Sequence, residues 1–140
     1  MSDPFDLQRF VDAQDSGGTY RQALAELRAG AKRSHWMWFV FPQLEGLGRS
    51  AMAQRYAISG PAEARAHLAH PVLGRRLLEC ARALTGLDGA DPVAVFGAVD
   101  AQKLHSSMTL FAAVSDDPVF GTVLDQYFGG VPDPGTTARL

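Results

Sequence analysis

The sequence has little cysteine, little net charge and no long hydrophobic run. Its one cysteine, Cys80, excludes an internal disulfide and a cysteine-rich metal site, and it fits a reducing compartment. The longest apolar run covers only residues 36–41, whereas a membrane-spanning helix needs about 20 residues. The first residues also lack the basic and apolar blocks of a secretory signal peptide. These absences predict a cytoplasmic protein with no membrane partner.

The composition is that of an ordinary globular domain. The formal net charge of −2 and the pI of about 6.0 argue against nucleic acid as a partner. Hydrophobic residues make up 46% of the chain, which is enough to build one core. A chain of 140 residues suits a single domain. We expect this domain to cover residues 1–130, followed by a flexible C-terminal tail over residues 131–140, a stretch with glycine, proline and threonine.

Helix signals recur along the chain. Asp3, Asp91 and Asp117 each precede a proline, and this pair is typical of helix starts because aspartate accepts hydrogen bonds from free amides while proline has none to satisfy. Glycines such as Gly30 are typical of helix ends. Together with the spacing of apolar residues, these signals predict helices over residues 4–14, 19–30, 50–58, 62–69 and 118–128, one from residue 70 that ends at Gly86 or Gly89, and one more that Asp100 caps.

One hydrophobic segment has no clear period. Residues 36–41 fit either a buried strand or a short buried helix, and we favour the helix because no second convincing strand is available to pair with it. The complete pattern predicts an all-α fold, an irregular multihelical single domain of about seven or eight short helices.

The residues best suited to bind a ligand or transfer a proton lie between positions 32 and 50, a stretch that we call the motif segment. It places Lys32, Ser34 and His35 directly before two tryptophans, and a loop with two glycines then leads to Ser50, a predicted helix start. Helix starts and cations favour anions, and indole rings can wall a pocket. His35 is the candidate for proton transfer, since its reference pKa of about 6.5 is near the working pH. We expect ligand binding by Lys32, Ser34, Trp36, Trp38, Gln43, Arg49, Ser50, Lys103, Ser106 and Ser107.

A purely structural interpretation of the same residues is also open. Tryptophan and phenylalanine runs form cores, Ser34 can cap a helix, and glycines can serve turns alone. Ser106 and Ser107 can line a polar cavity or allow a close contact between helices. No phosphate-binding loop, dinucleotide motif or metal-binding motif is present. The sequence therefore predicts no metal and no cofactor.

The motif segment resembles the bacterial family known as domain of unknown function 1810. The resemblance lies in the run from Lys32 to Gln43 with its His-Trp-Met-Trp-Phe core, in Gly46-Leu47-Gly48-x-Ser50, and in four further stretches. These begin at Phe5, Tyr56, His70 and Lys103. It covers about residues 3–128, and it implies an all-α, multihelical single domain. It implies no catalytic residue.

Two functions from different classes follow. The first is a small binding protein or enzyme for an anionic ligand, phosphorylated or nucleotide-like, whose pocket is built around the motif segment. The alternative is a non-enzymatic protein-interaction or stress-response module whose aromatic residues are core. The sequence leaves open whether any reaction is catalysed.

Overall fold

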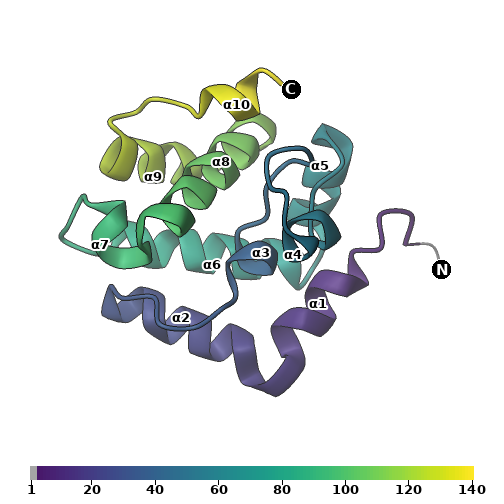
Figure 1. Ribbon diagram of the computed structural model, residues 1–140, viewed down its shortest axis with the longest axis horizontal. Coiled ribbons are helices and arrows are strands. Elements are labelled where there is room, and N and C mark those ends of the chain that lie inside the picture. Colours follow the sequence, from purple (N-terminus) through teal and green to yellow (C-terminus); the bar gives the residue numbers. More distant parts are fainter. Residues whose placement is uncertain (1–2) are drawn as a thin grey trace.

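Helices make up nearly all the regular structure of the computed structural model, which describes residues 3–140 (Figure 1). Over those residues, the strand-like pairing is limited to one parallel bridge between Leu44 and Ile58. The expected all-α, irregular multihelical fold is confirmed. The helices are α1 (Gln8–Asp15), the 3-10 helix η1 (Ser16–Gly18), α2 (Thr19–Ala29), α3 (Met37–Val40), α4 (Ala51–Arg55), α5 (Pro61–Ala69), α6 (Leu73–Thr85), α7 (Pro92–Phe96), α8 (Ala98–Val114), α9 (Val119–Phe128) and α10 (Pro134–Thr137).

The long helix α8 lies at the centre of the packing. It contacts α5, α7, α9 and α10, while α6 contacts α2, α5 and α9 (Figure 1). Because α8 is covered on several sides, its residues 106–111 are all buried, including three with hydroxyl groups. The largest fully buried side chains are aromatic, namely Trp36, Phe10, Phe41, Phe111 and Phe120. Burial of each such side chain contributes about 1.5–3 kcal/mol.

None of the helices built by residues 3–140 combines the length and the apolar character needed to cross a membrane.

The aspartates that precede prolines bind free backbone amides, as expected. Asp3, Asp91 and Asp117 each accept a hydrogen bond from a backbone N–H two to five residues further on. The first helix nevertheless begins at Gln8, four residues later than predicted. The reason is Asp6, whose φ of 51° lies in the left-handed region and interrupts a right-handed helix.

The start of α8 also differs from the prediction. The helix begins at Ala98, after Gly97 with its φ of 80°, and not at Asp100. Asp100 therefore lies in the first turn and its carboxylate is not used as a cap. It is available to pair with lysine side chains, which decides the geometry of the candidate site.

Residues 131–140, expected to be a flexible tail, contain a short helix and two buried polar residues. Asp133 accepts hydrogen bonds from Thr136 at the start of α10 and from Ser106 of α8, at 2.6 and 3.0 Å. The backbone N–H of Asp133 donates to Thr109 of α8. Asp133 and Thr136 are 5% and 0% exposed. Composition alone missed these anchors, because they depend on partners about 25 residues away in the chain.

Candidate functional site

The first half of the motif segment is held by a buried carboxylate. Glu26 of α2 is 8% exposed and accepts four hydrogen bonds: from the backbone N–H of Arg33 and of Ser34, from the Ser34 hydroxyl, and from the indole Nε1 of Trp36. Burial alone raises the pKa of Glu26, but these hydrogen bonds outweigh it and lower the pKa to about 2. Ser34 and Trp36, both expected to bind ligand, therefore donate hydrogen bonds to Glu26 and hold the motif segment against α2.

Two lysines that are far apart in the sequence meet at one aspartate. The Nζ of Lys32 lies 2.9 Å from one carboxylate oxygen of Asp100, and the Nζ of Lys103 lies 3.3 Å from the other. All three side chains are at most 20% exposed. The cluster carries two positive charges and one negative charge, so one positive charge is not neutralised within it.

Each lysine also lies against one of the two tryptophans. The ammonium of Lys32 is 5.0 Å from the ring centroid of Trp36, and that of Lys103 is 4.9 Å from the ring centroid of Trp38. Cations at this distance are attracted by the indole ring. The two rings differ in one respect: the N–H of Trp36 donates to Glu26, whereas the buried N–H of Trp38 has no acceptor in the part of the chain that the structure describes.

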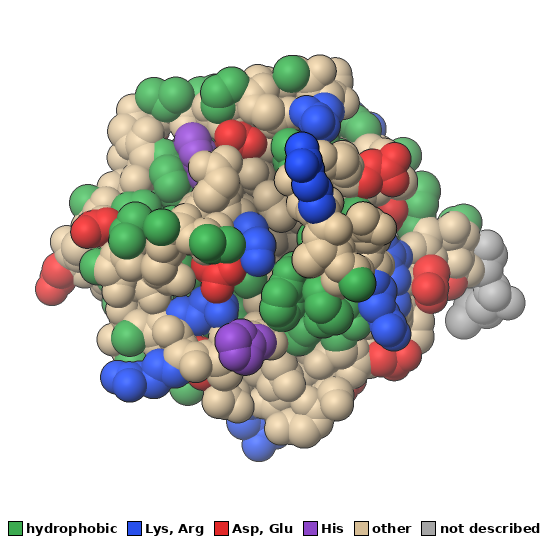
Figure 2. All heavy atoms as spheres, viewed as in Figure 1, with side chains coloured by type: hydrophobic (Ala, Val, Ile, Leu, Met, Phe, Trp, Pro, Cys, Tyr) green, Lys and Arg blue, Asp and Glu red, His purple; other side chains and the backbone are tan. Residues whose placement is uncertain are grey.

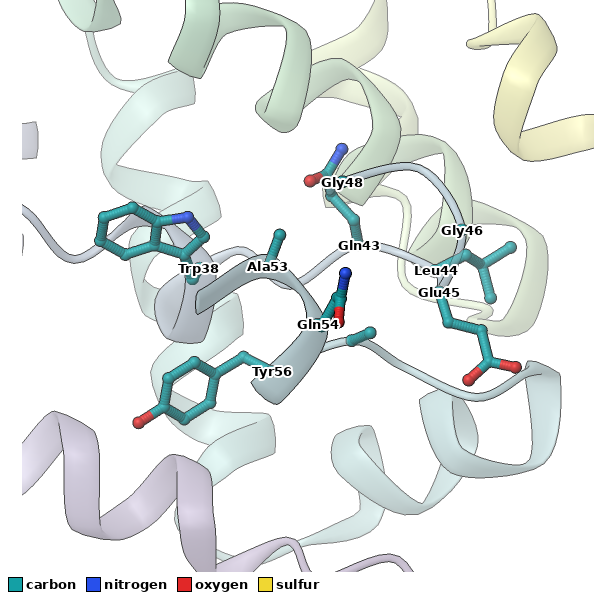
Figure 3. Close-up of a pocket in the computed structure, with 10 residues that line it drawn as sticks. Trp38, Gln43, Leu44, Glu45, Gly46, Gly48, Ala53, Gln54 and Tyr56 are labelled. Atoms are coloured by element: carbon teal, nitrogen blue, oxygen red, sulfur yellow. The ribbon is translucent and has the colours of Figure 1, made fainter. Parts of the chain in front are cut away.

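Trp38 lies on the wall of a cavity of about 180 Å³. The amides of Gln43 and Gln54 lie between Trp38 and the loop that carries Gly46 (Figure 3). The carboxylate of Glu45 points away from this space. The full lining is formed by Trp38, Gln43, Leu44, Glu45, Gly46, Gly48, Ala53, Gln54, Tyr56 and Ala57.

The loop that closes the cavity requires glycine. A Cβ on Gly48 would lie 2.5 Å from the Cβ of Ala53, so any other residue would push α4 away. Gly46 has a φ of 89°, and a Cβ there would lie 3.2 Å from the Nε of Arg139. The C-terminal segment therefore borders this loop, which the sequence did not indicate.

A hollow is visible on the face of the molecule drawn in Figure 2. Figure 2 shows lysine and arginine side chains around a depression near the centre of the face, beside a hydrophobic cluster and close to acidic side chains. The cavity lining itself contains no lysine or arginine, and the nearest established cation is the ammonium of Lys103, which lies 4.9 Å from the ring centroid of Trp38.

Trp38 and Gln43 are the predicted site residues that line the cavity, and the others, Lys32 and Lys103 included, lie outside its lining. Ser50 accepts a hydrogen bond from the N–H of Ala53 and caps α4. His35 and Arg49 are exposed, and neither lines the cavity. Ser106 donates to Asp133.

Ser107 differs from these residues in having an unused polar group. Its side chain is 0% exposed, and its hydroxyl has no partner within residues 3–140. It lies one helical turn beyond Lys103, on the same face of α8.

Over residues 3–140, no three histidine, cysteine or acidic side chains are grouped closely enough to hold a metal ion.

Sequence reasoning missed Glu26, although a weak signal was present. Glu26 follows Ala23 by three residues, so it lies at the edge of the apolar face of the predicted helix over residues 19–30. A carboxylate at such a position is buried only where donors surround it. Those donors belong to the motif segment, whose path depends on the complete fold.

Comparison with known proteins agrees with the fold. The chain is similar to the conserved hypothetical protein Rv1873 from Mycobacterium tuberculosis, whose crystal structure shares 52% sequence identity and a TM-score of 0.95. That similarity covers 99% of this chain and 98% of the other. A search of curated proteins found no match. The family model described as protein of unknown function DUF1810 matches residues 4–140, and the chain therefore belongs to the DUF1810 family.

Proposed function

We propose that this protein binds a small anionic ligand, phosphorylated or nucleotide-like, by placing an oxyanion group of the ligand in the cavity beside Trp38. The observation that carries the proposal is the indole N–H of Trp38, which is buried without an acceptor while a lysine ammonium lies 4.9 Å from the same ring. Buried donors normally have partners, and an anion would supply one.

The charge of the neighbourhood supports an anion. Lys32, Asp100 and Lys103 together leave one positive charge, and Asp100 prevents the two ammonium groups from repelling each other. Lys32 is 7% exposed and also donates to the carbonyl of Ser34, so its position is fixed by the framework. Lys103 is the more exposed of the two and is the cation proposed to meet the ligand.

The size of the cavity limits what enters it. A volume of about 180 Å³ corresponds to roughly six water molecules at about 30 Å³ each. Pockets for whole drug-sized ligands measure about 300–1,000 Å³. The cavity therefore suits a phosphate or carboxylate group, with the rest of the ligand outside over the glycine loop. Gln43 supplies a further amide at the cavity wall.

The proposal concerns binding and assigns no reaction, because His35 is exposed and does not line the cavity. A cytoplasmic location is part of the proposal. It is supported by the cysteine content of the chain, since its one cysteine, Cys80, forms no internal disulfide.

Isothermal titration calorimetry with inorganic phosphate and with AMP tests this function. Lys103→Met removes the charge but keeps the length of the side chain, and we expect it to weaken binding about tenfold. Trp38→Phe keeps a ring and removes only the N–H donor, and we expect a smaller loss of the same kind. The matched control is Arg65→Gln, an exposed position on α5 outside the cavity, which removes one positive charge and should leave the affinity unchanged.

Absence of saturable heat with both ligands would defeat the proposal. So would an equal loss of affinity in Lys103→Met and Arg65→Gln, because that result would indicate a general charge effect. The melting temperature of each variant shows whether a loss of binding comes from a loss of folding.

A further inference from the structure

A second positively charged feature lies between α2 and α6, which run side by side (Figure 1). Five arginines line the space between these helices, and we call it the arginine groove. They are Arg21 and Arg28 on α2, and Arg75, Arg76 and Arg82 on α6. None of them lines the Trp38 cavity.

The groove is continuous. It consists of two adjoining hollows of about 400 and 430 Å³, and both are lined by Arg75 and Glu79. The two carboxylates in the lining belong to Asp15 and Glu79. Five arginines against two carboxylates give this groove a net positive charge in a chain whose net charge is −2.

Some of these arginines already have partners. Arg76 lies 2.8 Å from the carboxylate of Asp15, and Arg82 lies 3.4 Å from that of Asp117. Glu79 accepts a hydrogen bond from the hydroxyl of Tyr20. These contacts hold the side chains of the groove in place, and the two ion pairs neutralise the charges of Arg76 and Arg82.

The remaining three arginines are available to a ligand. Arg21, Arg28 and Arg75 are exposed, and no carboxylate of residues 3–140 lies within ion-pair distance of them. Because these guanidinium groups come from both helices, they face one groove from two sides. Guanidinium groups bind carboxylates through two parallel hydrogen bonds, which favours Arg at sites for acidic partners.

We infer that the arginine groove binds an acidic peptide segment of another protein. The spacing fits an extended chain: Arg21 and Arg28, like Arg75 and Arg82, are seven residues apart on their helices, which is about 10.5 Å. Three residues of an extended peptide cover about 10 Å. Acidic side chains at that interval would meet successive arginines along the groove.

A nucleic acid fits the same groove less well. Its phosphates follow one another without a gap, so one of them would face the carboxylate of Glu79 in the middle of the groove. A peptide can place an uncharged residue there. The net charge of the chain also opposes general attraction to nucleic acid.

Fluorescence anisotropy with a fluorescein-labelled oligoglutamate peptide of about ten residues tests the inference, because such a peptide is long enough to follow both hollows. We expect saturable binding at low ionic strength that weakens as salt is added. Arg28→Gln/Arg75→Gln should weaken it about tenfold. The matched control Arg55→Gln/Arg65→Gln removes two exposed arginines elsewhere and should change the affinity by less than about twofold.

Three results would overturn the inference. The first is absence of saturable oligoglutamate binding, and the second is an equal loss in both double variants. The third is tighter binding of a labelled single-stranded or duplex DNA with the same sensitivity to Arg28→Gln/Arg75→Gln, which would assign the groove to nucleic acid. Lys103→Met should leave peptide binding unchanged, so the result of this test is independent of whether the cavity beside Trp38 binds an anion.

Discussion

Trp36 and Trp38 are two residues apart, and each has a lysine against its ring, yet their surroundings differ. Trp36 is 0% exposed and its N–H is bonded to Glu26. Trp38 is half-buried, lines a cavity, and its N–H has no acceptor among residues 3–140. The two lysines even share the same aspartate, Asp100.

This comparison separates the part of the motif segment that holds the fold from the part to which the proposed function assigns a ligand. On the Trp36 side every donor that faces Glu26 has an acceptor. The carboxylate of Glu26 accepts four hydrogen bonds there, one of them from the indole N–H of Trp36. The Trp38 side has a donor and a positive charge left over. Natural proteins seldom leave buried polar groups unpaired, so the incomplete side is where a ligand is expected.

Glu26→Ala should have the largest effect on stability. It leaves the N–H groups of Arg33 and Ser34 and the indole N–H of Trp36 without their acceptor. Hydrogen bonds to charged groups contribute about 1.5–3 kcal/mol each, so we expect a loss of about 3 kcal/mol or more in the free energy of unfolding, measured by urea denaturation.

Glu26→Gln is the matched variant for this test, because it keeps one acceptor oxygen and should cost less than Glu26→Ala. A loss below about 1 kcal/mol for Glu26→Ala would show that the motif segment is held by packing, and the contrast between the two tryptophans would disappear.

The next largest effect concerns His67, a buried group without partners that lines none of the cavities described above. Both of its ring nitrogens lack partners in the described chain, and it lies against Phe10 and Phe111. Burial, with smaller contributions from His70 and Arg9, lowers the pKa of His67 to about 3. The unfolded chain therefore takes up a proton near pH 6.5 that the folded protein does not. Above about pH 6.5 His67 is neutral in both states and does not change the free energy of unfolding. As the pH falls from 6.5 towards 3, protonation of the unfolded chain lowers the free energy of unfolding.

His67→Leu should remove this acid sensitivity. At about pH 4.5 the group costs the wild type about 2–3 kcal/mol, and the variant should lose that much less stability between pH 7 and this pH. Urea unfolding at both pH values measures the difference, in which contributions from Glu26 and Asp133 cancel. Equal losses in the two proteins would mean that His67 is protonated when folded.

Most features that could be predicted depend on near neighbours in the chain, and the meeting of Lys32 and Lys103 is the exception. Asp91 binds the amide of Val93, and Gly30 ends α2 with a φ of 74°, as their positions indicated. Lys32 and Lys103 were placed in one site on chemical grounds, and the structure does bring them together. The bonded state of Trp36 could not be predicted, because it depends on a carboxylate in another helix.

The C-terminal segment repeats the arrangement at Glu26 on a smaller scale. Burial raises the pKa of Asp133, but hydrogen bonds, first from Thr136 and then from Ser106, outweigh burial and lower it. Thr136→Val keeps the shape and removes the hydroxyl that donates to Asp133, and we expect a loss of about 1–2 kcal/mol. Hydrogen exchange should also show faster exchange at the backbone N–H of residue 136, which donates to the same carboxylate.

Ser107→Ala is the matched variant in α8. Its buried hydroxyl has no partner within residues 3–140, so its removal should cost less than about 0.5 kcal/mol. If Thr136→Val costs no more than Ser107→Ala and leaves exchange unchanged, residues 131–140 are as flexible as their composition indicated.

A small expected effect, that of Trp38→Phe, tests the comparison most directly. Trp38→Phe removes an N–H that has no partner in the described residues and should change the free energy of unfolding by less than about 1 kcal/mol, whereas Trp36→Phe should cost about 2 kcal/mol because it deprives Glu26 of a donor. Urea denaturation with and without phosphate separates the two roles. Added phosphate should stabilise the wild type and Trp36→Phe but stabilise Trp38→Phe less, because binding to the folded state raises its stability. If Trp38→Phe instead destabilises as much as Trp36→Phe, and phosphate stabilises all three proteins equally, both tryptophans only support the fold. The cavity then does not bind the anion.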